Sequence, residues 1–193
     1  MRLLSAFLIL TAGLVFAEDV NRPAQELEMK MENGQILKLS QLKGSPVVLE
    51  FFSTTCPHCQ KSAEVLERAL RTYGPKGLKI VAVSSTEEQR KDFPEFRKKY
   101  GATYPMGTVD NQAGYRFFSQ SVMKPFYVPT FAFIDKNGIL REQFVGGLLQ
   151  NNPNGGPQAE WAELVKHIEP LLKATAPAKP ATAARPAAAP AKR

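Results

Sequence analysis

One stretch of the chain joins a mostly apolar run to two closely spaced cysteines and then to a helix-like pattern. Residues 46–52 have the composition of a strand that is buried on both faces of a sheet. Helical periodicity begins at Pro57, a residue well suited to a first helical turn, and ends after Tyr73. The stretch therefore predicts a strand that leads directly into a helix, with Cys56 and Cys59 at the junction.

Strand and helix patterns alternate along the rest of the chain. Two Asn-Gly dipeptides, at residues 33–34 and 137–138, separate alternating runs and predict β-hairpins. Further strands are expected at residues 78–83 and 104–109, and further helices at residues 86–100, 112–119 and 161–172. Alternating strands and helices imply right-handed crossovers and a parallel sheet, to which the last hairpin would add antiparallel edge strands. We therefore expect an α/β fold: a mixed sheet with helices on both faces and an N-terminal hairpin.

The length and charge of the chain restrict what it can be. At 193 residues it is long enough for one domain with a proper core, which we place at residues 18–173. The formal net charge of +7 looks basic, but five basic residues stand from Lys173 onward and Arg2 lies near the start. The body between them carries 19 basic and 18 acidic residues. A nearly neutral body does not favour nucleic acid as a partner.

The first 17 residues read as an export signal. Arg2 precedes a largely apolar segment, and residues 15–17 offer small side chains at the positions that a signal peptidase reads. An uncleaved membrane anchor is the alternative, although the apolar run is shorter than the about 20 residues that spanning requires. Either interpretation places the body outside the cytoplasm, as a periplasmic or secreted protein.

Residues 174–193 are rich in Ala, Pro and basic side chains and hold no larger apolar group. Such a segment buries too little surface to offset the entropy of ordering it, so we expect a disordered tail. A solvated spacer is the simplest interpretation. Loose attraction to anionic lipid or cell-wall polymer is the alternative.

Cys56 and Cys59 could form a structural disulfide or a redox centre. A loop with two residues between the cysteines restrains little of the unfolded chain, so a structural bridge would contribute little stability. The strand-to-helix junction favours redox chemistry instead. A helix N-terminus favours a thiolate, so we expect Cys56 to be the nucleophile, with a pKa below that of free cysteine. Cys59, about one turn into the helix, would be the resolving thiol.

With these motifs the chain resembles the thioredoxin superfamily, especially its exported TlpA/ResA-type members. The resemblance covers roughly residues 27–172 and includes the strand with Cys56-Pro57-His58-Cys59 and a later Val128-Pro129-Thr130 segment. About 70 residues separate Cys59 from Pro129, which suits the extra strand–helix insertion of that type. The resemblance implies a thioredoxin-like fold and exchange of disulfides with protein thiols.

The resemblance also assigns roles to residues outside the cysteine pair. Pro129 would follow a cis peptide bond, although most X–Pro bonds are trans, and the Val128 backbone would pair with an extended substrate segment. Glu50, six residues before Cys56, stands where such proteins often place a buried acid. A buried carboxyl group has a raised pKa and could accept the Cys59 proton near neutral pH. An exposed glutamate at a strand end is the alternative.

The sequence departs from the common pattern around the cysteines. Thr55 replaces the usual tryptophan, which would reduce the apolar surface for docking partners. Pro57 and His58, like Val128 before the proline, resemble the oxidant DsbA. A histidine beside the thiolate stabilises the reduced form, so we expect a less negative reduction potential than thioredoxin's, about −270 mV. TlpA/ResA relatives are mostly reductases, so a dedicated reductase in cytochrome c maturation is an alternative function.

Other functions are weighed against this exchange enzyme, for which we expect protein substrates, a membrane or soluble redox partner, and no cofactor. A copper-binding chaperone would need a further histidine, and His167 is expected to be a partly exposed surface group. We therefore assign no metal site. A binding module without catalysis is another alternative. A peroxiredoxin-type peroxidase would need the pattern Pro-x-x-x-Thr-x-x-Cys, which is missing.

Overall fold

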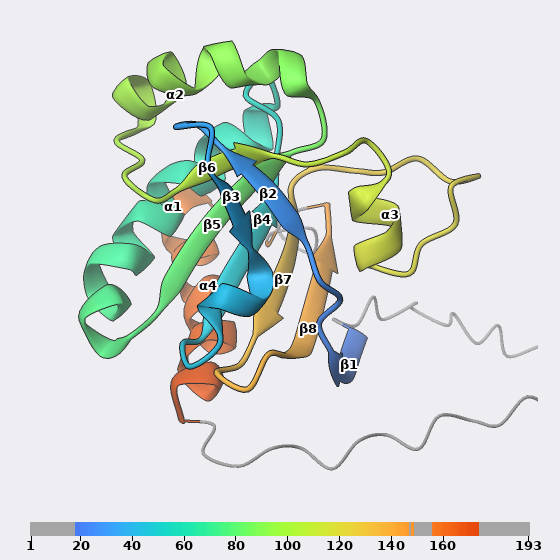
Figure 1. Cartoon of the computed structure of the whole chain (residues 1–193). Coiled ribbons are helices and arrows are strands. Elements are labelled where there is room, and N and C mark those ends of the chain that lie inside the picture. The colour runs from blue at the N-terminus through green and yellow to red at the C-terminus, as the bar shows by residue number, and fades with distance from the viewer. Residues whose placement is uncertain (1–17, 147, 149–155, 174–193) are drawn as a thin grey trace, which may run out of the picture.

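The computed structural model describes residues 18–146, 148 and 156–173, and these form one mixed sheet with helices packed against it (Figure 1). The predicted export signal, residues 1–17, and the predicted tail, residues 174–193, lie outside the described residues. The sheet has the strand order β1-β8-β7-β4-β5-β6-β2-β3. Its strands are β1 (Glu18–Pro23), β2 (Glu28–Met31), β3 (Ile36–Lys38), β4 (Val47–Phe51), β5 (Lys79–Ser84), β6 (Met106–Thr108), β7 (Thr130–Ile134) and β8 (Ile139–Val145).

The centre of the sheet is parallel, as the alternation of strands and helices predicts. β4 pairs with β5 and β5 pairs with β6, all in parallel. The N-terminal hairpin β2–β3 is antiparallel and extends the sheet beyond β6. The second hairpin, β7–β8, is also present, but the expectation that it supplies edge strands is wrong. β7 pairs with the central strand β4, and β8 lies between β7 and β1.

The outer strand β1 is not predicted from the sequence. It pairs antiparallel with β8, with a register shift between Asp19 and Arg22. Its segment carries charged residues, an asparagine and a proline, and only one large apolar residue, Val20. An edge strand pairs on one side and can lie in solvent, so its sequence needs no apolar alternation. Its place in the sheet follows from β8 and not from a local pattern.

Four α-helices complete the described fold, with short 3₁₀ segments between elements (Figure 1). They are α1 (Pro57–Tyr73), α2 (Phe93–Tyr100), α3 (Ala113–Phe117) and α4 (Gly156–Lys173). The expected second helix begins as a 3₁₀ segment, Glu87–Asp92, and becomes α-helical at Phe93 with Pro94 in its first turn. Proline is tolerated there because a first-turn N–H has no intrahelical partner. None of the helices in the described ranges is long and apolar enough to cross a bilayer.

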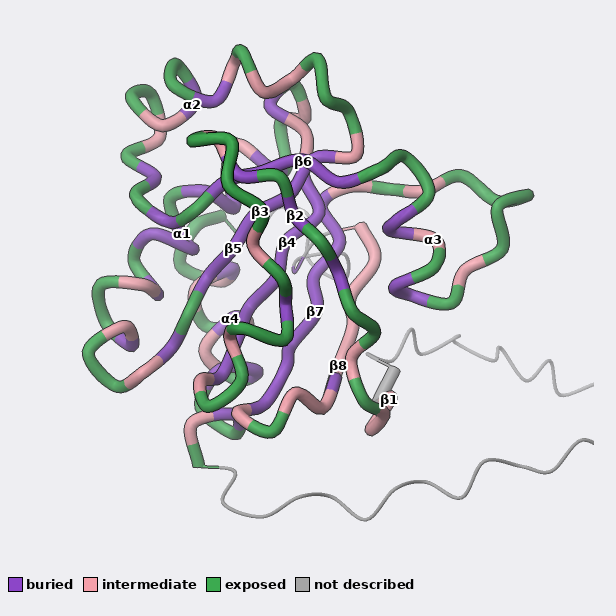
Figure 2. Tube along the Cα trace, viewed as in Figure 1, coloured by how far each residue is buried: buried purple, intermediate pink, exposed green. Residues whose placement is uncertain are grey.

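Helices cover both faces of the sheet, as expected, and each face has its own apolar core. Figure 2 shows that the central strands β4, β5 and β7 consist mostly of buried residues. One core joins the sheet to α1, α2 and α4, and the other joins it to α3 and the N-terminal segments. Successive side chains of a strand point to opposite faces. In β4, Val48 therefore belongs to the first core and Leu49 to the second. The same alternation turns Glu50 toward the face that α1 and α4 cover.

Candidate active site

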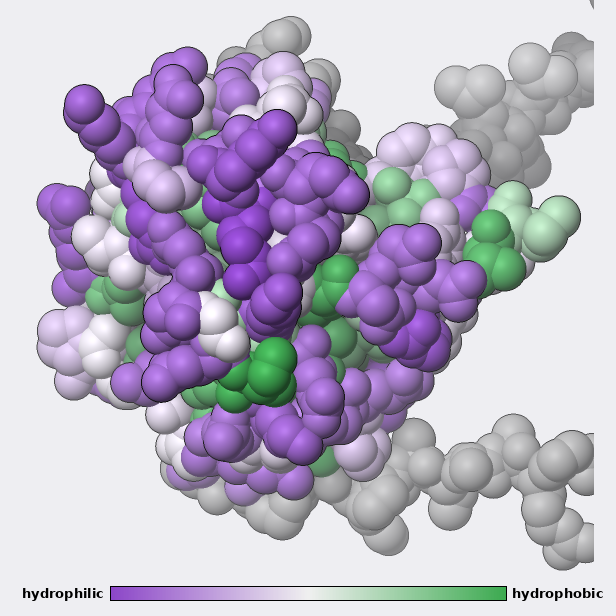
Figure 3. All heavy atoms as spheres, turned by 45° about the horizontal axis from the view of Figure 1, so that its top comes forward, coloured by the Kyte–Doolittle hydropathy of each residue, from purple (hydrophilic) through white to green (hydrophobic). Residues whose placement is uncertain are grey.

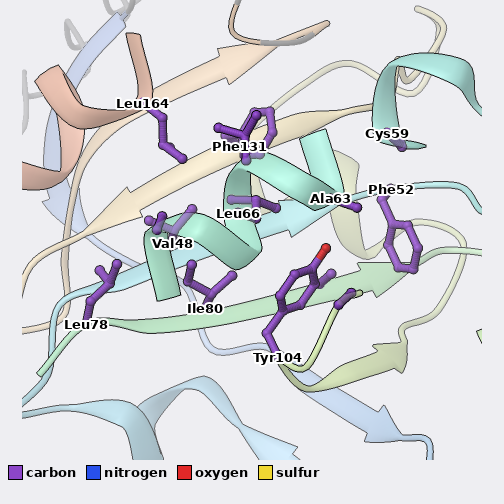
Figure 4. Close-up of a cluster of buried hydrophobic side chains, with 14 of the residues drawn as sticks. Val48, Phe52, Cys59, Ala63, Leu66, Leu78, Ile80, Tyr104, Phe131 and Leu164 are labelled. Carbon is purple, nitrogen blue, oxygen red and sulfur yellow. The ribbon is translucent and has the colours of Figure 1, made fainter. Parts of the chain in front are cut away.

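The two cysteines lie where β4 ends and α1 begins, as the sequence predicts. Cys56 is the N-cap residue of α1, and Pro57 stands in the first turn. Cys56 is partly exposed, whereas Cys59 is buried, and both are free thiols. Figure 4 shows Cys59 on α1 near Phe52, within the buried cluster. The start of the helix thus leaves the Cys56 side chain partly accessible to solvent and buries that of Cys59.

The turn between β4 and α1 is fixed by a glutamine that sequence reasoning missed. Gln89 donates from Nε2 to Ser53 Oγ (2.8 Å), and its Oε1 accepts from the backbone N–H of Thr54 (3.0 Å). The N–H of Ser53 in turn faces Cys59 Sγ at 3.5 Å. Gln89 belongs to the 3₁₀ segment after β5, so only the fold brings it to the cysteines. No local motif marks such a residue.

A loop from a distant part of the chain closes over the first cysteine. The Val128–Pro129 peptide bond is cis. The carbonyl oxygen of Val128 lies 3.5 Å from Cys56 Sγ, within reach of a thiol donor. The same segment carries three exposed apolar side chains, Tyr127, Val122 and Met123. Figure 3 shows apolar atoms at the protruding right-hand tip, where this segment lies in Figure 1.

Glu50 is a buried acid beneath the cysteines and not an exposed residue at a strand end. Its side chain is 1% exposed. Burial raises its pKa well above the usual range, and the nearby charges of Glu160 and Cys56 raise it further. Burial likewise raises the pKa of Cys59, with the charge of Glu50 adding to the effect. A buried thiol and a buried carboxyl group therefore lie close enough for the charge of Glu50 to act on Cys59, and each resists carrying a charge.

Glu160 joins this site from α4 and is not among the residues predicted from the sequence. It is 7% exposed, and its Oε1 lies 2.9 Å from the hydroxyl of Ser62 on α1. A signal was present in the sequence: Glu160 precedes Leu164, Ile168 and Leu171 at helical spacing, so an acid occupies the apolar face of the helix. A charged side chain in such a stripe needs a partner or a function.

The remaining residues of the motif lie at the surface. Thr55, Pro57 and His58 are exposed around the partly exposed Cys56. Thr55 Oγ1 is 3.0 Å from Ser53 Oγ, so it joins the turn and not an apolar platform. Their positions allow the predicted roles in substrate contact and redox tuning, which stay predictions.

The expectation for His167 is wrong. His167 is buried between Phe133 and Phe144, with ring centroids at 5.0 and 4.5 Å, and its Nδ1 pairs with Glu142. α4 packs on the sheet, so the apolar stripe that buries Leu164 also buries a residue three positions on. Within the described ranges, no three His, Cys, Asp or Glu side chains gather in a way that could hold a metal ion.

Comparison with known proteins places this geometry in a family. The model of the AhpC/TSA family matches residues 20–143, which include both cysteines and the cis-proline loop. Among solved structures, one from Chlorobium tepidum, described as a proposed thiol:disulfide interchange protein DsbE, superposes with a TM-score of 0.64. It is 25% identical, and the match covers 80% of this chain and 98% of that one.

Curated relatives of this chain carry the name thiol-disulfide oxidoreductase ResA. The protein of Halalkalibacterium halodurans is 26% identical over 147 residues, which cover 76% of this chain and 74% of the relative. The protein of Bacillus thuringiensis is 30% identical over 113 residues, covering 58% of this chain and 62% of the relative. The chain thus spans less than two thirds of the second relative's length.

Proposed function

Because the chain belongs to the AhpC/TSA family, we propose that it is a thiol–disulfide oxidoreductase that exchanges disulfides with protein substrates. The observation that carries this proposal is the unequal pair of thiols: Cys56 is reachable at the N-terminus of α1, and Cys59 is buried one turn further on. The relatives named as thiol-disulfide oxidoreductases support the same reaction class. Peroxidase chemistry is not favoured, because Leu49 stands where the peroxiredoxin pattern requires proline.

The reaction proceeds by two sulfur displacements. The Cys56 thiolate attacks a substrate disulfide, so a bond forms between Cys56 and one substrate sulfur while the other leaves as a thiolate. Cys59 then attacks Cys56 Sγ, which releases the second substrate thiolate and leaves a Cys56–Cys59 disulfide. The substrate has gained two electrons and the enzyme has lost them. The reverse sequence oxidises a substrate dithiol.

Glu50 supplies the proton acceptor for the second displacement. Cys59 is a poor nucleophile while it holds its proton, and burial raises its pKa. Because burial also raises the pKa of Glu50 above that of an ordinary carboxyl group, Glu50 is a stronger base than an exposed acid. The proton of Cys59 passes to Glu50 as the sulfur–sulfur bond forms.

The substrate docks as an extended segment against the cis-proline loop. The Val128 carbonyl stands beside Cys56, so backbone pairing there brings a substrate sulfur to the nucleophile. Tyr127, in the same segment, is 60% exposed and offers an apolar contact to the substrate. Thr55, which precedes Cys56, offers little apolar surface. The partners are protein thiols and disulfides, with a second redox protein to reset the enzyme. We place this activity outside the cytoplasm, with residues 1–17 as the export signal.

The two cysteines give separate tests of the mechanism. Cys56→Ser should abolish both the reduction of insulin disulfides and the oxidation of a model dithiol peptide. Cys59→Ala should still attack but should accumulate mixed disulfides on Cys56, which mass spectrometry after acid trapping identifies. Activity of Cys56→Ser in both assays would end the proposal. Partners that carry a Cys-x-x-Cys-His haem-attachment motif would favour the alternative of a cytochrome c maturation reductase.

A further inference from the structure

The proposed reaction gives no role to Glu160, a buried carboxyl group beside the redox centre. Glu160 lies on α4, about a hundred residues from the cysteines in the sequence, yet it contacts α1 through Ser62. Ser62 is 1% exposed and stands three residues after Cys59. A carboxyl group buried this deeply at the edge of a redox centre calls for a physical account.

Ser62 can serve Glu160 in either of its protonation states. The hydroxyl oxygen of Ser62 is 2.9 Å from Glu160 Oε1 and 3.0 Å from the carbonyl oxygen of His58. When Glu160 is a carboxylate, Ser62 donates its single proton to it. When Glu160 is protonated, it donates to Ser62, which then donates to the His58 carbonyl. Neither state leaves a buried hydroxyl without a partner, so Glu160 can exchange its proton inside the fold.

Glu160 also acts on Glu50. Glu50 is 1% exposed, and its Oε1 has no hydrogen-bond partner among the described protein atoms. After burial itself, the charge of Glu160 is the largest influence that raises the pKa of Glu50. Because electrostatic coupling between two acids is reciprocal, we expect the two to titrate as a pair.

The other ionisable groups around the pair are few. Burial raises the pKa of Glu160, while the Ser62 hydrogen bond and the charges of Lys61 and His58 on α1 oppose that rise. On the Glu50 side stand Cys56, Cys59 and the buried phenol of Tyr104. Figure 4 shows the Tyr104 hydroxyl directed toward α1. Among the described residues that influence Glu50, Glu160 is thus the acid that comes from outside the cysteine helix α1.

We propose that Glu160 is a positioning residue of the redox centre. By gaining or losing its own proton while it stays hydrogen-bonded to Ser62, Glu160 sets the pH range in which Glu50 accepts the proton of Cys59. The inference rests on the proposed function. In the resolving step the Cys59 S–H bond breaks, its proton goes to Glu50, and a bond forms between the two cysteine sulfurs. The bond between Cys56 and the substrate breaks, and its electron pair leaves with the substrate sulfur. A negative Glu160 makes Glu50 the stronger base for this step.

The test is the pH dependence of the resolving step, measured in single turnover from a preformed mixed disulfide. Glu160→Gln keeps the side-chain length and a donor toward Ser62 but can never be negative. We expect the rise in rate that reports the ionisation of Glu50 to move to lower pH by roughly one unit. Glu169→Gln, which removes an acid at the far end of the same helix, should leave this midpoint in place.

A double variant isolates the coupling. In a Glu50→Gln background, adding Glu160→Gln should produce no further change in the pH profile, because Glu160 acts through Glu50. If Glu160→Gln slows the step equally at every pH with an unchanged midpoint, Glu160 is only structural and the inference fails. If that variant does not fold, Ser62→Ala replaces it, since loss of the donor disfavours the Glu160 charge and shifts the midpoint in the same direction.

A titration of the unmodified protein separates this inference from the proposed function. Carbon-13 signals of the two carboxyl groups, followed by NMR against pH, should each show two inflections if the acids are coupled. Two independent single-step curves would overturn the inference while leaving thiol–disulfide exchange intact. Failure of the wild-type protein to exchange disulfides at any pH would instead overturn the proposed function.

Discussion

His58 is the exposed side chain between the two cysteines, and its effect should appear in the reduction potential. A histidine at a helix N-terminus beside a thiolate stabilises the reduced form through its charge or its N–H. We predict a potential less negative than about −270 mV, the thioredoxin value. We predict further that His58→Ala lowers it by at least about 30 mV, which corresponds to a tenfold change in the equilibrium constant.

Equilibration with glutathione buffers measures both potentials. Glu64→Gln, a change at an exposed position nearly two turns further along α1, is the matched control and should leave the potential near that of the wild type. A wild-type value at or below about −270 mV would show that His58 does not tune the centre.

For single residues, the sequence predicts those that lie close to the cysteines along the chain. It does not predict those that reach the site only because distant elements pack together. Cys56, Cys59 and Glu50 lie within ten residues of one another. The apolar pattern of the strand and the start of the helical pattern are therefore enough to predict that they share one site. Gln89 and Glu160 reach the same site from other elements. Only the packing of those elements against α1 and its preceding turn reveals their contacts.

The hairpin β7–β8 depends on a buried ion pair at its turn. Asp135 is fully buried and accepts hydrogen bonds from the N–H groups of Asn137 (2.8 Å) and Ile139 (3.0 Å) and from Arg141. Arg141 also donates to Asn21 in β1 (2.8 Å), so the pair ties the edge strand to the hairpin. Burial acts to raise the pKa of Asp135, but these hydrogen bonds outweigh it and leave the pKa lowered.

We predict that Asp135→Asn lowers the free energy of unfolding by about 3–5 kcal/mol at neutral pH, because the Arg141 charge loses its partner. Since the pKa of Asp135 is lower in the folded state, its contribution is present above the unfolded pKa and disappears as the pH falls. Urea denaturation at several pH values measures both effects. Asp110→Asn breaks an exposed pair with Arg116 and should cost at most about 1 kcal/mol. Equal losses for the two variants would contradict the assignment.

Elements and their pairings differ in how far the sequence predicts them. The helix at Pro57 and the Asn-Gly hairpins follow from contacts within a few residues, and both are present. The position of β7 beside β4 joins residues about 85 apart, such as Val48 and Phe133, and no local pattern encodes it. β1 is not predicted for a related reason. Its own residues are mostly charged or polar, and its pairing depends on β8, a strand more than a hundred residues away.

Considered as a whole, the molecule places an ionisable group where its core would be most stable with an apolar one. Glu50 stands in the five-residue buried strand β4, between β5 and β7 and beneath α1. Burial raises its pKa, so the folded state binds a proton that the unfolded state releases at the same pH. The acid that the reaction uses is therefore a source of instability for the entire domain at neutral pH.

Global unfolding of the reduced protein should reveal this conflict. The folded pKa of Glu50 lies above the unfolded one, so the wild type should lose stability as the pH rises from about 4.5, by about 1.4 kcal/mol per pH unit until Glu50 ionises. Glu50→Gln removes this proton linkage, so its advantage over the wild type should grow with pH across the same range. Urea denaturation from pH 4 to 8 measures the difference, with the exposed substitution Glu64→Gln as the control. A constant difference between Glu50→Gln and wild type at every pH would mean that Glu50 is not the proton-binding group in the core, and the role proposed for it in accepting the Cys59 proton would be lost with it.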